Sequence, residues 1–209
     1  MQSTIFEPTN LPELPQPGFI NQWVLESPTP LALASLAIVT ILFGTLRTTQ
    51  YAKKIGIPVL AAGLIFAGTL FLVGFFITTD AENLKTKSHA LVNAITETDR
   101  LSLESLLDEQ VRVQTRFTSR SGRVRILDLA QAQVAPIIES AVIKEVRTGL
   151  YGPQIARTYI KIKTKGDMIP PLSWWMLDWT RLSPTSDNWV VTHIEPLWIQ
   201  GITNPAGSK

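Results

Sequence analysis

Residues 172–182 have the sequence LSWWMLDWTRL, and this stretch decides the class of fold of the C-terminal part of the chain. Side chains of a strand alternate between two faces. Trp175, Leu177 and Trp179 therefore share one face, and Trp174, Met176 and Asp178 share the other. Both faces are mainly apolar, which predicts a strand that is covered on both sides. Helices of the same domain would cover one face, and a second subunit or the N-terminal tail would cover the other.

Four segments in this part of the chain have the alternation that is typical of strands. Runs rich in Gly, Pro, Ser and Asp separate them at residues 149–153, 166–171 and 183–187, and such runs are typical of turns. The predicted strands are residues 137–148, 155–165, 172–182 and 188–199.

The preceding residues predict three helices and one further strand. Thr79 begins a capping box, which predicts the start of the first helix, and Asp99 can cap a second, short helix. Residues 111–117 alternate as a strand, and residues 123–134 suit a third helix. The faces expected to enter the core contain Leu84, Leu91, Val92 and Ile95 in the first helix and Leu127, Ala130 and Val134 in the third. This order predicts an α+β domain over residues 80–209, with helices packed on one face of a curved antiparallel sheet.

The composition indicates that another part of the chain avoids water. Only 17% of the residues are charged and the mean hydropathy is +0.15, whereas soluble domains contain roughly 25% charged residues. The apolar excess lies in two charge-free blocks, residues 29–46 and 55–79. Because a bilayer core needs about 20 apolar residues, the blocks predict a transmembrane hairpin over residues 29–79. The alternatives are two buried core helices or, for the first block, a cleaved signal peptide.

The charges around the hairpin predict its orientation. The connecting loop, residues 47–54, contains three basic and no acidic residues. The Pro-rich tail, residues 1–28, contains three acidic and no basic residues. Basic loops stay on the cytoplasmic side. The tail and the domain of residues 80–209 are therefore expected outside the cytoplasm, most simply at a bacterial inner membrane. The tail is expected to be extended over the domain or a partner, or else disordered.

Small residues in the hairpin indicate close packing of its helices. Thr40 and Gly44 on the first helix, and Gly63 and Ala67 on the second, are each four positions apart, a spacing that lets helix backbones approach. Neither block contains an ionisable residue, which argues against transport or a proton relay. The hairpin is predicted to be an anchor or an assembly surface.

The order of elements after residue 80 resembles that of the NTF2-like superfamily, also called SnoaL-like or cystatin-related folds. The similar stretches are LSLESLLDEQVRVQ after the paired helices, SGRVRILDLAQ leading into IIESAVIKEV, and the final SWWMLDWTRL and NWVVTHIEPLWI. The resemblance covers roughly residues 80–200 and excludes the hairpin. It implies a cone of three helices on a curved sheet, with a pocket between them and frequent dimerisation through the sheet. Members include isomerases, dehydratases, cyclases, binding modules and extracytoplasmic subunits of secretion systems, so the fold alone does not define a function.

Candidate catalytic residues are few. Asp178 could be a catalytic carboxylate, His193 beside Glu195 could be an oriented imidazole, and His89 could be a base or a ligand. For each, an ordinary pairing or surface role is the commoner alternative. The tyrosine and aspartate pair of the isomerases in this superfamily cannot be placed in this chain. With no cysteine and two histidines, no metal or cofactor is expected.

Two surfaces are candidate contact sites. Arg157, Lys161, Lys163 and Lys165 alternate along one strand and could contact anionic lipid head groups or an acidic partner, or simply face water. Trp174, Met176 and Trp198 could form an exposed apolar interaction surface. The net charge of +2 argues against a nucleic-acid partner.

Together these features predict a membrane-anchored, non-enzymatic binding or scaffold protein that presents an NTF2-like domain outside the cytoplasm, possibly within a larger membrane assembly. Its expected partners are the lipid bilayer and a protein or second copy bound through the sheet, with a small apolar ligand as a further option. The alternative is a membrane-tethered SnoaL-like enzyme of the isomerase, dehydratase or cyclase type acting on a small apolar substrate. An enclosed cavity with a buried carboxylate or histidine would favour the enzyme.

Overall fold

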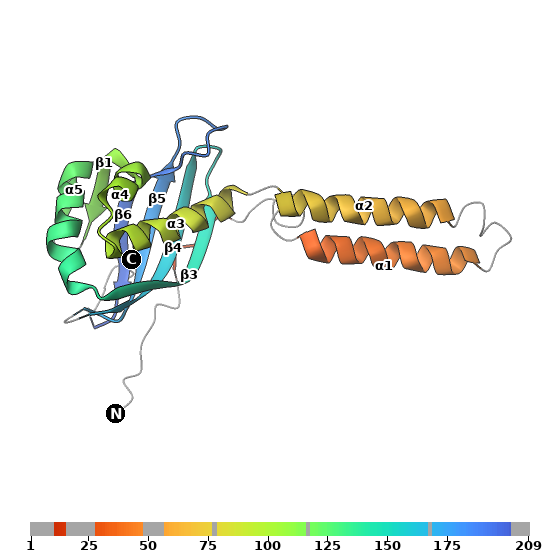
Figure 1. Ribbon diagram of the computed structural model, residues 1–209, viewed down its shortest axis with the longest axis horizontal. Coiled ribbons are helices and arrows are strands. Elements are labelled where there is room, and N and C mark those ends of the chain that lie inside the picture. Colours follow the sequence, from red (N-terminus) through yellow and green to blue (C-terminus); the bar gives the residue numbers. More distant parts are fainter. Residues whose placement is uncertain are drawn as a thin grey trace, which may run out of the picture. The chain divides into compact units, whose positions relative to one another are not determined.

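The computed structural model describes residues 11–15, 28–47, 57–76, 79–115, 118–166 and 169–201. The chain divides into two compact units (Figure 1). One contains two helices, α1 (Pro28–Arg47) and α2 (Ile57–Phe76), and the other contains the described residues from Asp80 onward together with segment 11–15. Most of the basic loop predicted at 47–54, and most of the tail predicted at 1–28, lie outside the described residues.

Within their own unit, α1 and α2 run side by side in opposite directions (Figure 1). Gly63 of α2 is buried against Val39 of α1, and a Cβ atom at Gly63 would lie 2.7 Å from Cγ1 of Val39. The predicted close approach of the helices is therefore confirmed at Gly63. Among the described residues, nothing lies within 4 Å of a Cβ atom placed at Gly44.

The outward side of this helix pair is apolar. Its exposed side chains include Leu33, Ile38, Ile41, Ile65 and Phe66. Within the stretches that the structure describes, no helix combines the length and the apolar character that a membrane crossing requires. The membrane spans predicted at 29–46 and 55–79 gain no support from this finding and stay a prediction.

Three helices belong to the larger unit: α3 (Asp80–Thr96), α4 (Arg100–Leu106) and α5 (Arg123–Leu129). The core face predicted for α3 is confirmed, since Leu84 and Leu91 are buried. The face predicted for the third helix is wrong beyond Leu129. There the chain continues as a π-helical turn (Ala130–Val134) and a 3₁₀ turn (Ala135–Ile137). A π turn holds more residues than an α turn, so the side chain of Val134 rotates away from the core and is exposed.

Asp99 caps α4 as predicted, because its carboxylate accepts a hydrogen bond from the backbone N–H of Ser102 at 3.2 Å. Hydrogen bonds from Ser102 lower the pKa of Asp99. We expect Asp99→Ala to lower the midpoint of thermal unfolding by roughly 3–5 °C at neutral pH. Because the folded-state pKa is the lower one, this stabilisation is present above the unfolded pKa and is lost as pH falls through the folded pKa.

Thermal unfolding followed by circular dichroism, at neutral pH and through the acid range, measures this difference. Glu97→Ala is the control, since Glu97 is an exposed carboxylate just before the cap. Equal shifts in the two variants, or a shift for Asp99→Ala that persists in acid, would contradict the capping role.

The sheet has six strands in the order β2-β1-β6-β5-β4-β3. The strands are β1 (Leu107–Gln114), β2 (Ser119–Ser121), β3 (Ser140–Leu150), β4 (Ile155–Lys165), β5 (Leu172–Thr180) and β6 (Val190–Ile199). Neighbours pair antiparallel except β1 and β6, which are parallel. The predicted α+β class is confirmed. The sequence does not predict the short β2. The sheet is mixed because α5 and the strands β2, β3, β4 and β5 intervene between β1 and β6, a connection long enough for parallel pairing.

The three helices cover one face of this sheet, and α3 lies across its strands (Figure 1). The core between them contains fully buried Leu84, Leu127, Trp179 and Trp189. Leu177 and Trp179 of β5 both point into it, as the alternation of residues 172–182 predicts.

The face of the sheet turned away from the helices, which we call the open face, has a second apolar cluster. Tyr159, Trp174 and Met176 form it, packed against Leu197 and Trp198 and against Leu11 and Leu14 of the N-terminal segment. The prediction that β5 is covered on both sides is therefore confirmed, and the tail supplies the second cover. The expectation of an exposed patch needs correction, because Trp174 is 2% and Met176 8% exposed.

Simple alternation along the last strand predicts that Val191, His193 and Glu195 share one face, and this prediction is wrong from His193 onward. A register shift separates the pair Trp179–Val191 from the pair Asp178–His193. The extra residue of such a bulge turns the side chains that follow it to the opposite face, up to a second register shift between Pro196 and Trp198. Val191 therefore enters the core on the helix side, whereas His193 lines a groove on the open face.

Candidate functional site

An open groove of about 570 Å³ lies on the open face of the sheet. Alternate residues of adjacent strands point to the same face of a sheet, so β1, β4, β5 and β6 each contribute side chains. The lining consists of Asp108, Gln110, Arg112, Arg157, Met176, Asp178, Thr192, His193 and Glu195. The structure thus brings together two of the three catalytic candidates, Asp178 and His193.

Asp178 of β5 forms a bidentate ion pair with Arg157, its directly paired residue on β4. Nε of Arg157 donates to Oδ1 of Asp178 at 2.6 Å, and Nη2 of Arg157 donates to Oδ2 at 3.1 Å. The hydrogen bond to Asp178 raises the pKa of Arg157 far above its ordinary value. The ring of Tyr151 lies 5.6 Å from the same guanidinium. Because both carboxylate oxygens accept hydrogen bonds, Asp178 is held as a structural partner rather than as a free base.

His193 is the cross-strand neighbour of both Asp178 and Arg112. Its Nε2 lies 3.5 Å from Oε2 of Glu195, which is longer than an ordinary N–H···O hydrogen bond. The groove is open to solvent, so a proton transfer here would not be shielded from water. His89, the third candidate, is exposed on α3 and does not line the groove.

The basic residues predicted as one contact surface have different surroundings. Arg157 is paired with Asp178, and Lys165 Nζ lies 3.0 Å from Oε2 of Glu139. Lys161 Nζ lies 5.7 Å from the centre of the Trp174 ring. Lys163 is exposed. Contact of this stripe with lipid head groups or an acidic partner stays a prediction.

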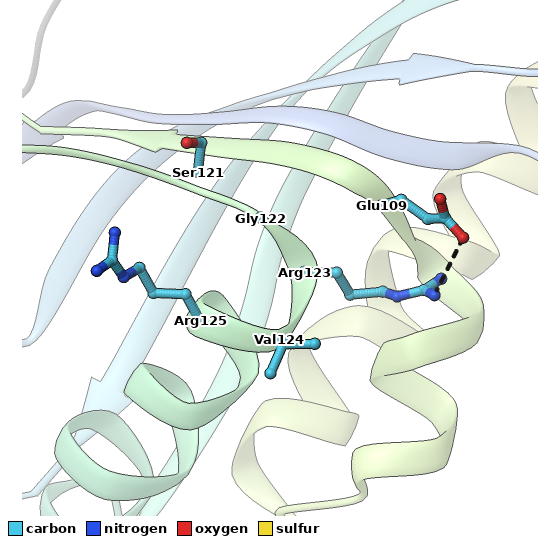
Figure 2. Close-up of a pocket in the computed structure, with 6 residues that line it drawn as sticks. All are labelled: Glu109, Ser121, Gly122, Arg123, Val124 and Arg125. Atoms are coloured by element: carbon cyan, nitrogen blue, oxygen red, sulfur yellow. Dashed lines mark ion pairs between the residues drawn. The ribbon is translucent and has the colours of Figure 1, made fainter.

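A second pocket, of about 450 Å³, lies where α5 begins beside β1 (Figure 2). Arg123 turns toward Glu109, 3.6 Å away, and donates to the backbone carbonyl oxygens of Glu104 and Leu107. Arg125 points away from this pair (Figure 2). Arg123 therefore ties α5 to the chain around the start of β1, and the pocket has the character of a surface depression.

Neither pocket opens into the space between the helices and the sheet, where the apolar core lies. Among the residues that the structure describes, no three His, Asp or Glu side chains gather closely enough to hold a metal ion. Both pockets are open to solvent and are lined in part by charged side chains.

Three residues of the open face were not singled out from the sequence. Tyr159 is 1% exposed, and burial raises its pKa. Within the described part of the chain its hydroxyl makes no hydrogen bond of good geometry. Its position between Arg157 and Lys161, in an otherwise basic stripe, was the available signal. Leu11 and Leu14 are ordinary leucines of a Pro-rich tail, and no pattern in the sequence marks them as part of the domain.

The site and the fold define a class: an α+β domain with an apolar interior and a polar groove on its open face. Neither a family model nor a curated protein sequence matches the chain. Among solved structures it is similar to an NTF2-like protein from Cytophaga hutchinsonii, with 14% identity, 57% of this chain and 98% of that chain covered, and a TM-score of 0.49. It is also similar to the hexachlorocyclohexane dehydrochlorinase LinA-type3 from Novosphingobium barchaimii, with 11% identity, coverages of 60% and 90%, and a TM-score of 0.48. A cystatin-like fold protein from Burkholderia xenovorans has 18% identity, coverages of 56% and 91%, and a TM-score of 0.45.

Proposed function

We propose that this chain is a membrane-anchored, non-enzymatic binding protein and one subunit of a larger membrane assembly. In this proposal α1 and α2 form the membrane hairpin, and residues 80–209 form an NTF2-like domain outside the cytoplasm. A partner protein or a second copy binds the open face of the sheet.

The observation that supports anchoring most is the apolar outside of the helix pair. Ile41 is 66% and Ile65 71% exposed, and both helices bear further exposed apolar side chains. Helices that are apolar all round need an apolar surrounding. The first charge-free block, residues 29–46, lies within α1, and the second, residues 55–79, extends beyond α2 at both ends. The proposal rests on both blocks.

The pairing of Asp178 favours binding over catalysis. Its two oxygens accept hydrogen bonds from Arg157, and the groove beside it is open. The alternative, a SnoaL-like enzyme acting on a small apolar substrate, needs an acid or base in a dry pocket. The groove has no such surrounding, so the enzyme has less support.

The anchor can be tested with a periplasmic reporter enzyme, active only outside the cytoplasm, fused after Lys209 in a Gram-negative bacterial host. Because the loop 47–54 has the basic residues, we expect reporter activity, and we expect the full-length chain in the membrane fraction until detergent is added. Placing glutamate at Arg47, Lys53 and Lys54 together is expected to reduce reporter activity severalfold.

A cytoplasmic reporter fused at the same position serves as the reciprocal control. The proposal would be overturned by cytoplasmic activity of the unchanged chain, or by its recovery in the detergent-free soluble fraction.

A further inference from the structure

The N-terminal segment 11–15, Leu-Pro-Glu-Leu-Pro, is in contact with the open face of the sheet. Leu11 and Leu14 pack on the cluster of Tyr159, Trp174 and Met176. Without this segment, the two aromatic side chains would lie on a face that no helix covers. The segment therefore occupies a surface formed by residues that follow it in the chain by more than a hundred positions.

Gly149 makes room for the segment. A Cβ atom at Gly149 would lie 2.8 Å from Cδ of Pro15 and 2.9 Å from Cβ of Leu14. The backbone of Gly149 is not left-handed, so the conformation of β3 does not require glycine there. A glycine inside a strand often marks a close approach of another backbone, and here the approaching chain is the tail. The sequence had placed Gly149 in a turn, but β3 continues through it to Leu150.

Placing the tail on this cluster has costs that offset part of its stabilisation. Among the described residues the buried hydroxyl of Tyr159 makes no hydrogen bond of good geometry, although the side chain of Arg157 interacts with it, and burial of an incompletely satisfied hydroxyl is unfavourable. Ordering the segment also costs conformational entropy, which its two prolines reduce. The burial of two leucines is thus partly offset, and these terms together favour a contact that can open.

The charges beside the cluster suit the segment as well. Arg147 lies 5.3 Å and Lys161 5.7 Å from the centre of the Trp174 ring. The segment has an exposed acidic residue, Glu13, between its leucines. Arg147 also forms an ion pair with Glu145 at 2.6 Å, so its charge is partly compensated. The cationic side chains beside the ring still disfavour a basic ligand.

We infer that the Tyr159–Trp174 cluster with Gly149 is a recognition site for an extended Leu-Pro-acidic-Leu-Pro segment, and that such a segment supplied by another molecule replaces the tail. This inference deepens the proposed binding function, because it names the partner chemistry of the open face. It does not depend on the membrane anchor, so the peptide experiment below and the reporter experiment above can fail independently.

The probe is a fluorescein-labelled peptide of residues 8–18, PTNLPELPQPG, and binding to the purified full-length chain in detergent is measured by fluorescence anisotropy. In the Leu11→Asp, Leu14→Asp double variant the tail no longer competes. We expect it to bind the peptide at least tenfold more tightly than the unchanged chain, because an attached competitor acts at a high effective concentration. A peptide with both leucines replaced by Asp should not bind.

Gly149→Val, introduced into the double variant, tests the site itself. Its side chain would occupy the place of Leu14 and Pro15, so we expect peptide affinity to fall at least tenfold. Gly152→Val is the matched control, since a Cβ atom at Gly152 meets nothing within 4 Å, and it should bind as the double variant does. If Gly149→Val does not fold, Gly149→Ala replaces it, because the Cβ atom alone makes the close contacts.

Two results would overturn the inference. One is equal peptide affinity of the double variant and the unchanged chain. The other is equal affinity of the folded Gly149 and Gly152 variants. If instead the unchanged chain exchanges tails between two copies, size measurements will show a dimer that the double variant loses, and this outcome supports the same recognition site.

Discussion

Arg181→Met is expected to lower the free energy of unfolding of the domain by about 3 kcal/mol. The side chain of Arg181 is 6% exposed and forms a two-pronged ion pair with Asp80, the first residue of α3, at 2.7 and 2.9 Å. It also donates to the backbone carbonyl oxygens of Pro153 and Ser186. Methionine fills a similar volume but leaves Asp80 and both carbonyls without this donor. Asp80 stays 31% exposed, which keeps the loss at the lower end of the range for buried pairs.

Urea denaturation of the full-length chain in detergent, followed by tryptophan fluorescence, measures this loss. Trp189 donates to Asp80 and stacks 4.5 Å from the guanidinium of Arg181, so its signal reports on the same cluster. Arg181→Lys keeps the positive charge but cannot form the bidentate hydrogen bonds of a guanidinium group. Its unfolding free energy should therefore lie between those of the unchanged chain and Arg181→Met. Arg100→Met is the control, because its pairs with Glu104 and Asp128 are widely exposed, and no measurable change is expected. Equal losses at positions 181 and 100 would contradict the argument.

Trp179→Ala is expected to cost about 4 kcal/mol of unfolding free energy. Trp179 is 0% exposed in the core between helices and sheet. Its indole N–H donates to Oγ1 of Thr158 at 2.9 Å, on the neighbouring strand. The substitution removes a large apolar contact, leaves a cavity and deprives Thr158 of its donor.

The same denaturation measurement applies, with Trp175→Ala as the matched control. Trp175 is on the same face of the same strand, and its indole donates to Ser173 at 2.8 Å, but it is only partly buried. The decrease in unfolding free energy caused by Trp175→Ala should therefore be clearly smaller. A cost for Trp175→Ala that equals or exceeds that of Trp179→Ala would show that burial in this core does not govern stability.

Most of the domain fold could be predicted from local patterns. The helix that begins at Asp80, the Asp99 cap and the two faces of β5 depend on residues a few positions apart, and the structure agrees with each. The errors come from irregular backbone. The π turn after Leu129 and the bulge before His193 each change the direction of the following side chains, and neither has a signature in the hydropathy pattern.

The candidate site was harder to predict than the fold. Asp178 and His193 were found because titratable residues are rare in these strands, but the partner of Asp178 lies on a strand 21 positions away in sequence. The tail on Trp174 and the Asp80–Arg181 pair depend on contacts over still longer separations. Alternation within a strand predicts which face of the sheet a residue occupies. It does not predict which residues of other segments contact that residue.

By itself the sequence determined the two charge-free blocks, the α+β order of elements and the doubly apolar strand at 172–182, because these follow from composition and from the periodicity of helices and strands. The sequence does not show that Asp178 pairs with Arg157, that Leu11 and Leu14 cover the cluster of Tyr159 and Trp174, or that His193 lies on the open face. The physical reason is that register and chain reversal place residues of distant segments in contact, and those contacts determine the burial and charge of each side chain.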